Sequence, residues 1–143
     1  MQAKIRGVEA MAQRAAECVA SLTPKESGAT VIVLSGGLGA GKTTFVQGMA
    51  KALGVEDTVT SPTFVLEKVY AIEGQPFARL VHVDAYRLKG AHELEVLGWK
   101  ELIQNPGNLI VLEWPERVAE AIPTDAIRIK FDIHGDGRII TRA

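Results

Sequence analysis

The stretch VIVLSGGLGAGKTTF, residues 31–45, restricts the possible folds of this chain more than any other segment. Its apolar run at residues 31–34 has the profile of a short strand that is covered on both faces. A glycine-rich turn follows, and residues 42–53 then have the spacing of a helix that ends at Gly54. A buried strand, a tight turn and a helix in this order predict an α/β fold with a mainly parallel sheet.

The glycines of this stretch also match the spacing G-x-x-x-x-G-K-[ST], which is typical of a phosphate-binding loop. Glycine lets the backbone turn so that successive N–H groups converge on a β-phosphate, and the following helix directs its positive dipole end to the same point. Lys42 would supply a mobile charge to the β- and γ-phosphates, and the Thr43 hydroxyl is placed to bind Mg²⁺. The predicted nucleotide-binding residues of the loop are Leu38, Gly39, Ala40, Gly41, Lys42, Thr43 and Thr44.

The rest of the chain supports the same fold class. The pattern predicts helices over residues 8–22, 91–103 and 115–122, and strands over 64–72, 77–86, 109–114, 126–133 and 138–142. The first two and the last two of these strands are separated by short turns, so we expect antiparallel hairpins. We therefore predict a P-loop NTPase-type three-layer sandwich in which antiparallel strands extend a mainly parallel sheet, formed as a single domain over residues 1–143.

Bulk properties exclude several classes of function. The chain has 143 residues and is 47% hydrophobic, but no apolar run approaches the roughly 18 residues that cross a membrane. The N-terminus lacks the apolar block of a secretory signal, so we expect a cytoplasmic protein. The 16 basic and 17 acidic residues are interspersed, without the basic block of a protein that binds nucleic acid unaided. The single cysteine, Cys18, has helical spacing and is expected to be a small core residue.

Two acidic residues close apolar runs that are predicted to be strands. Asp84 ends RLVHVD, and Glu113 ends NLIVLE. A nucleoside triphosphatase needs an acid at the end of a neighbouring strand to hold the metal or its water, although either carboxylate could instead cap the next loop. Trp114 follows Glu113 directly, where it would cover the site, dock a partner or shield the sheet edge.

The loop TSPTF, residues 60–64, occupies the place of a γ-phosphate sensor. Thr63 is the first candidate for this role and Ser61 the second, although both are also ordinary turn residues. Guanine-specific enzymes with this type of loop carry an Asn-Lys-x-Asp signature, whereas neither Asn105 nor Asn108 is followed by lysine. We therefore expect ATP as the nucleotide.

Taken in order, GGLGAGKTTF, SPTF, HVDAYRL and LIVLEWPER resemble the TsaE (YjeE) family, bacterial ATPases required for threonylcarbamoyladenosine synthesis on tRNA. The resemblance covers about residues 28–123. It implies that Lys42 and Thr43 bind phosphate and Mg²⁺. It also implies that Glu113 is the second acid beside the metal and that Asp84 is needed for hydrolysis.

The same resemblance implies further contacts and partners. It places Ser61 and Thr63 in a switch-like loop and Trp114 beside the nucleotide. In this family the ATPase acts with the TsaB and TsaD subunits, which transfer the threonylcarbamoyl group from an adenylate supplied by a TsaC-type enzyme. The ATPase is thought to reset that assembly between turnovers, so tRNA would be engaged indirectly through the complex.

Three functions remain open from the residues alone. The first is an Mg²⁺-dependent ATPase that is slow alone and stimulated by partner proteins, because no arginine is clearly placed to act as a catalytic finger. Arg79, Arg87 and Arg117 are the candidates for that role. The second is a small-molecule kinase, for which the segment between the first hairpin and Glu113 is short, since kinases of this type carry a lid with clustered arginines. The third is a nucleotide-dependent binding module with little turnover.

Overall fold

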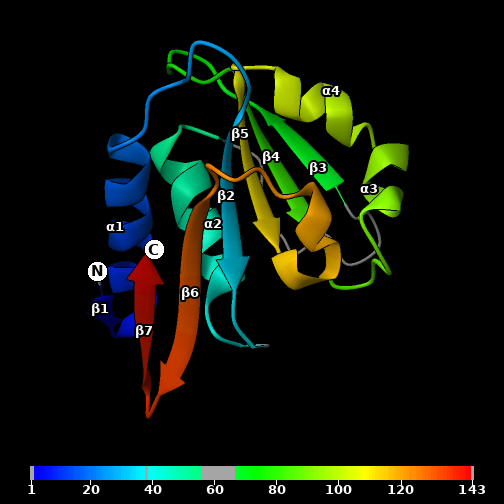
Figure 1. Cartoon of the computed structure of the whole chain (residues 1–143). Helices are drawn as coiled ribbons and strands as arrows, with labels where there is room; N and C mark the ends of the chain where they lie inside the picture. Colours follow the sequence, from blue (N-terminus) through cyan, green and yellow to red (C-terminus); the bar gives the residue numbers. More distant parts are fainter. Residues whose placement is uncertain (1, 38, 56–66, 143) are drawn as a thin grey trace.

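The order of strands and helices is given by a computed structural model, which describes residues 2–37, 39–55 and 67–142 (Figure 1). The helices of the described ranges are α1 (Gly7–Ala20), α2 (Lys42–Ala52), α3 (His92–Val96), α4 (Trp99–Gln104) and the 3₁₀ helix η1 (Pro115–Ala121). The strands are β1 (Gln2–Ile5), β2 (Thr30–Ser35), β3 (Glu67–Ala71), β4 (Arg79–Asp84), β5 (Asn108–Glu113), β6 (Ile127–His134) and β7 (Gly137–Arg142).

These strands form one sheet in the order β1-β7-β6-β2-β5-β4-β3. The central strands are parallel, because β2 pairs with both β5 and β6, and β5 pairs with β4. The pairs β3–β4, β6–β7 and β1–β7 are antiparallel and extend the sheet on both sides. The predicted fold class is therefore confirmed, including both antiparallel hairpins.

The register of the parallel strands places their carboxyl ends at one edge of the sheet. Glu113 pairs with Leu34 on one side and with Asp84 on the other. Neighbouring strands lie about 4.8 Å apart, so these three positions form a row directly below the loop that leaves β2. Ligands of open parallel sheets bind at this edge.

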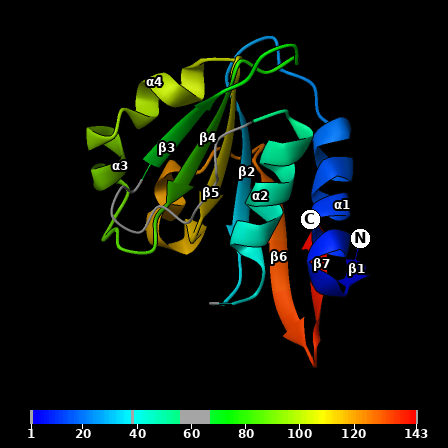
Figure 2. The same cartoon turned by 180° about the vertical axis from the view of Figure 1, so that it is seen from behind.

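Helices cover both faces of the sheet and give three layers. On one face, α1 and α2 pack side by side, and Figure 2 shows α2 lying across β2. Their core includes Met11, Phe45 and Met49 together with Ile32 and Leu34 of β2. On the other face, the core beneath α3, α4 and η1 contains Leu94, Trp99 and Val118 packed on alternate residues of the same strands. The apolar run of β2 is thus buried on both sides, as its composition predicted.

The described residues correct two details of the expected secondary structure. The single helix predicted over 91–103 is wrong: α3 and α4 are separate, because Gly98 adopts a φ of 82° in the left-handed region and turns the chain between them. Strand β1 was not predicted at all. Its sequence, QAKI, has too few apolar residues to indicate a strand, and its conformation depends on pairing with β7 at the far end of the chain.

Two further expectations from the sequence concern Cys18 and the membrane. Cys18 is half-buried and packs against the core between the sheet and the α1–α2 layer, as predicted for a small core residue. Burial raises the pKa of its thiol, although the positive charges of Arg142 and Arg14 act in the opposite direction. Within the described ranges, no helix is long and apolar enough to cross a bilayer.

Candidate active site

The predicted phosphate loop connects the carboxyl end of β2 to the amino end of α2. Gly39 and Gly41 adopt φ values of 76° and 101°, a region that side chains with a Cβ rarely occupy. Gly36 admits no side chain for a second reason, since a Cβ there would lie 2.5 Å from the backbone oxygen of Phe131. These three glycines are therefore required by the path of the backbone.

The amino end of α2 directs its first N–H groups toward this loop. The first hydrogen bond of the helix runs from the N–H of Phe45 to the carbonyl of Gly41, at 2.9 Å. The N–H groups of residues 42–44 precede that bond and point out of the helix end, where the helix dipole favours an anion. Thr43 and Thr44 line the pocket in front of this end.

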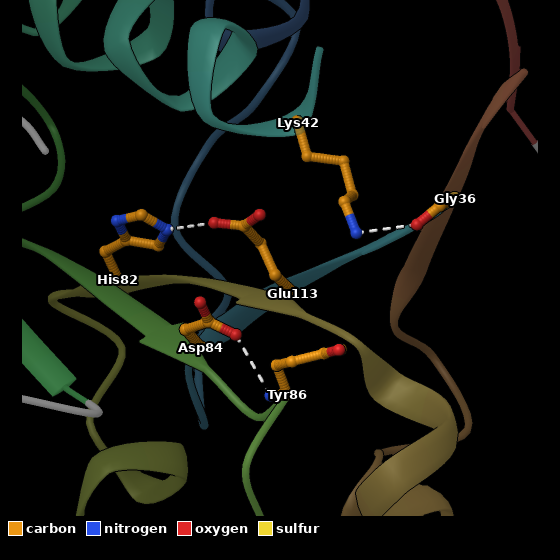
Figure 3. A network of polar contacts seen from close by, with 6 residues as sticks. All are labelled: Gly36, Lys42, His82, Asp84, Tyr86 and Glu113. Atoms are coloured by element: carbon orange, nitrogen blue, oxygen red, sulfur yellow. Dashed lines mark hydrogen bonds and ion pairs between the residues drawn. The ribbon is translucent and has the colours of Figure 1, made fainter. Parts of the chain in front are cut away.

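Lys42 lies at the centre of the site with its ammonium group turned back onto the loop (Figure 3). Nζ donates a hydrogen bond to the carbonyl of Gly36 at 2.7 Å and lies 3.6 Å from the centre of the Trp114 ring. Burial lowers the pKa of Lys42 from its ordinary value, while Glu113 and two further acids act in the opposite direction. A buried ammonium group with backbone and ring contacts is held ready for exchange with a stronger acceptor, such as a phosphate.

The two predicted acids lie side by side at the ends of β4 and β5. An oxygen of Asp84, Oδ1, accepts a hydrogen bond from the backbone N–H of Tyr86 at 3.0 Å, which fixes the carboxylate at the strand end. Glu113 is 3% exposed, and both acids line the same pocket as the phosphate loop. The structure therefore brings Lys42, Thr43, Asp84 and Glu113 together as the sequence predicted.

A buried histidine stands behind Glu113. It is the first residue of the segment HVDAYRL, but nothing in the sequence indicated its role. His82 is fully buried, and its Nε2 lies 2.6 Å from Oε2 of Glu113. Because a carboxylate can only accept, we assign the hydrogen to Nε2. The other ring nitrogen, Nδ1, is buried without a hydrogen-bond partner among the described residues. His82 and Asp84 alternate on β4 and so face the same side of the sheet, as the strand predicted over residues 77–86 implies.

Trp114 covers the site from the side of η1. It is the one described residue other than glycine with a positive φ, 63°. Its ring packs against that of Tyr86 at a tilt of 54°, with ring centres 4.8 Å apart, and the guanidinium of Arg117 lies 5.5 Å from the Tyr86 ring. Of the three uses considered for Trp114, covering the site is the one that its contact with Lys42 supports.

The pocket has a volume of about 380 Å³ and extends beyond the predicted residues. Its far wall is formed by Ile5, Gly7, Val8 and Met11, from the end of β1 and the start of α1, and by Asp136 and Arg138 of the last hairpin. No motif marks these residues. They reach the phosphate loop because β7 pairs with β1 at this edge of the sheet and because α1 packs along α2.

The other predicted residues are placed as follows. Leu38, Ser61 and Thr63 lie outside the described residues. Arg79 is the first residue of β4 and lies at the opposite end of that strand from Asp84. It donates a 2.7 Å hydrogen bond to Asn108, the first residue of β5. Among the described residues, no group of three or more histidine, cysteine, aspartate or glutamate side chains is gathered as a metal site.

Several known proteins that resemble this chain share one description. The family model for threonylcarbamoyl adenosine biosynthesis protein TsaE matches residues 5–140. The tRNA threonylcarbamoyladenosine biosynthesis protein TsaE of Treponema pallidum is 41% identical over 108 residues, which are 76% of this chain and 76% of that protein. The protein of the same name from Streptomyces coelicolor is 44% identical over 105 residues, 71% of this chain and 68% of that protein.

A solved structure is similar over nearly the whole chain. The crystal structure of YdiB from Bacillus subtilis superposes with a TM-score of 0.78 at 28% sequence identity. The match covers 99% of this chain and 83% of YdiB. Both this match and the family model extend past residues 28–123 to include the β1 and β7 ends of the pocket.

Proposed function

Because this chain belongs to the TsaE family of threonylcarbamoyl adenosine biosynthesis proteins, we propose that it is an Mg²⁺-dependent ATPase of tRNA modification. Hydrolysis of ATP would support threonylcarbamoyl transfer to adenosine in tRNA by partner subunits. From the family resemblance, these partners are the TsaB and TsaD subunits, and tRNA is engaged indirectly through their complex. One observation carries the proposal: the phosphate loop, Lys42 and two strand-end acids line a single pocket.

The described residues fit a nucleoside triphosphate. A pocket of about 380 Å³ falls within the usual range for a small-molecule site. Its phosphate end carries the helix N–H groups and the Lys42 ammonium, whose contact with the Gly36 carbonyl would be exchanged for a phosphate oxygen. Its other end has the apolar side chains of Ile5, Val8 and Met11, which suit a flat purine base.

The described residues also fit a magnesium ion. Magnesium prefers oxygen ligands and commonly takes one or two protein side chains together with substrate phosphates. The Thr43 hydroxyl and the Glu113 carboxylate are oxygen donors that line the same pocket, and His82 holds Glu113 from behind. When bound, the ion would neutralise charge on the β- and γ-phosphates.

Hydrolysis then depends on what the side chains do around the γ-phosphate. Asp84 accepts a hydrogen bond from the attacking water and orients it, while Lys42 stabilises the charge on the transferring group. The water oxygen forms a bond to the γ-phosphorus, and the bond from that phosphorus to the bridging oxygen breaks. ADP leaves, together with inorganic phosphate that retains both protons of the water. In this proposal Trp114 packs beside the nucleotide. Leu38, Ser61 and Thr63, the last as the γ-phosphate sensor, belong to the proposal from the sequence alone.

The kinase alternative is weakened by the role of the segment between β4 and β5. Residues 92–104 form α3 and α4, which bury Leu94 and Trp99 against the sheet. The Trp99 indole also donates a hydrogen bond to the carbonyl of Ala121 at 3.2 Å. Side chains of α3 and α4 pack into the core, so these helices do not form a lid over the pocket.

The test is phosphate release from ATP by the full chain, with and without the TsaB–TsaD pair. We expect slow release alone and faster release in the complex. Glu113→Gln should raise the Mg²⁺ concentration needed for half-maximal release. Asp84→Asn should lower the rate at every Mg²⁺ concentration, while its amide oxygen can still accept the Tyr86 N–H. Glu120→Gln, which removes the same charge from an exposed position later in η1, is the matched control.

Three results would overturn the proposal or parts of it. Phosphate that appears on an added metabolite would indicate a kinase. Tight ATP binding without release, even in the complex, would indicate a binding module. If neither Glu113→Gln nor Asp84→Asn changes release, the assignment of the two acids is wrong.

A further inference from the structure

Arg138 of β7 bonds directly to the phosphate loop, although 99 residues separate the two in sequence. Its Nε and Nη2 both donate to the carbonyl oxygen of Gly39, at 3.2 and 3.0 Å. Its Nη1 donates to the carbonyl of Gly137 at 3.0 Å, which holds the guanidinium plane against its own strand. The side chain also lines the pocket. We propose that Arg138 is a positioning residue that holds the phosphate loop in its nucleotide-binding shape.

The geometry of the peptide bond explains what this contact does. The peptide that joins Gly39 to Ala40 is planar and trans, so its carbonyl and its N–H point in opposite directions. Arg138 holds the carbonyl on the β7 side, and the N–H of Ala40 is thereby turned into the loop, where it donates to the carbonyl of Gly37 at 3.3 Å. One side chain therefore sets the direction of a loop N–H group.

The loop needs such an anchor because of its composition. Gly36, Gly37, Gly39 and Gly41 lie within six consecutive residues, and glycine loses more conformational freedom on ordering than any other residue. If such a loop became ordered only on phosphate binding, the conformational entropy lost at that step would weaken the affinity for phosphate. A guanidinium with two donors on one carbonyl orders the Gly39 peptide beforehand.

The position of Arg138 in the sheet makes the anchor rigid. Arg138 pairs with Ile5 of β1 and with Ile133 of β6 in the backbone ladder, and the next residue but one, Ile140, is buried in the core. Because the guanidinium is always charged, it also adds permanent positive charge to the pocket. The β1–β7 strand pair thus contributes Ile5 to the apolar wall of the pocket and Arg138 to its phosphate end.

The inference rests on the proposed nucleotide binding, so the test separates the two. Affinities of the full chain for Mg²⁺·ATP and for inorganic tripolyphosphate with Mg²⁺ are measured by calorimetry, and phosphate release gives kcat and KM. Arg138→Met keeps a long side chain but removes its hydrogen-bond donors. Arg138→Lys keeps the positive charge but not the paired donors Nε and Nη2 of the guanidinium. Arg128→Met, at an exposed position of the adjacent strand β6, is the matched control.

We expect Arg138→Met to bind both ligands about tenfold more weakly, the size expected for a lost charge-assisted hydrogen bond. The KM for ATP should rise by a similar factor with kcat within about twofold, because the anchor acts on ground state and transition state alike. Arg138→Lys should lie between Arg138→Met and the wild type, and Arg128→Met should match the wild type. If Arg138→Met does not fold, the same measurements on Arg138→Lys decide.

Each other outcome overturns the inference in a distinct way. Unchanged affinity for both ligands shows that Arg138 does not order the loop. A loss confined to ATP shows that Arg138 contacts the base or the ribose instead. A wild-type chain that binds neither ligand overturns the proposed function, and the inference with it.

Discussion

Replacing His82 by asparagine or by glutamine tests whether a buried hydrogen bond fixes Glu113. His82 is fully buried, and its Nε2 lies 2.6 Å from Oε2 of Glu113. The amide nitrogen of glutamine reaches about as far along the side chain as Nε2, whereas that of asparagine reaches only about as far as Nδ1. Glutamine therefore retains a donor for Glu113, and asparagine removes it with little change in polarity.

The size of the effect follows from burial. A hydrogen bond to a charged group contributes about 1.5–3 kcal/mol, and a buried carboxylate left without a donor costs at least as much. Glu113 is 3% exposed, so water replaces the lost donor poorly. We expect His82→Asn to lower the free energy of unfolding by about 2 kcal/mol, which is about 7 °C in Tm for a chain of this size. His82→Gln should lose about half as much or less.

Thermal unfolding without nucleotide measures the loss of stability. The Mg²⁺ dependence of phosphate release measures the effect on the orientation of Glu113. A carboxylate without its donor adopts several orientations, so His82→Asn should need more Mg²⁺ for half-maximal release, and His82→Gln should recover most of the loss. Equal Tm values and equal Mg²⁺ requirements for the two variants would refute the reasoning, since they would show that the hydrogen bond does not hold Glu113.

Two further predictions concern Lys42 and Gly48. Burial lowers the pKa of Lys42 below its ordinary 10.5, so the cost of burying the charged amine is present at low pH and is relieved as pH rises toward 10.5. Bound phosphates favour the charged form of Lys42, so ATP affinity should fall as pH rises toward 10.5. Calorimetry in buffers of different ionisation enthalpy should detect proton uptake on ATP binding at alkaline pH. Absence of this uptake would contradict the assignment of Lys42 to the phosphates. Gly48→Ala should destabilise the chain by about 1–2 kcal/mol in thermal unfolding, because a Cβ there would lie 2.8 Å from Cα of Ala12 and 2.9 Å from Cβ of Ala15. Gly37→Ala, where the Cβ meets open space, is its control, and equal Tm values would show that the α1–α2 contact can adapt.

The features that could be predicted are those in which local sequence determines local structure. The run at residues 31–34 is apolar throughout and became a strand buried on both faces. Gly41 and Lys42 marked the start of α2, and Gly54, with a φ of 79°, closes the helix as expected. Asp84 and Glu113 were found because each directly follows an apolar run, and parallel strands bring their carboxyl ends to one edge.

The features that were not predicted depend on packing between segments that are distant in the sequence. Strand β1 exists because β7 pairs with it, and the helix predicted over 91–103 divides at Gly98 so that residues on both sides can pack on one face of the sheet. A glycine inside a helical pattern is compatible with both outcomes, and packing decided between them.

The sequence by itself determined which ligand chemistry this protein can offer: a phosphate loop, a lysine and two acids, each encoded within a few neighbouring residues. The tertiary structure alone decided what surrounds and fixes that chemistry. His82 reaches Glu113 across 31 residues, and Arg138 reaches Gly39 across 99. Such contacts depend on the order and register of strands, which arise from burial of the whole sheet between two layers of helices and leave no local pattern in the chain.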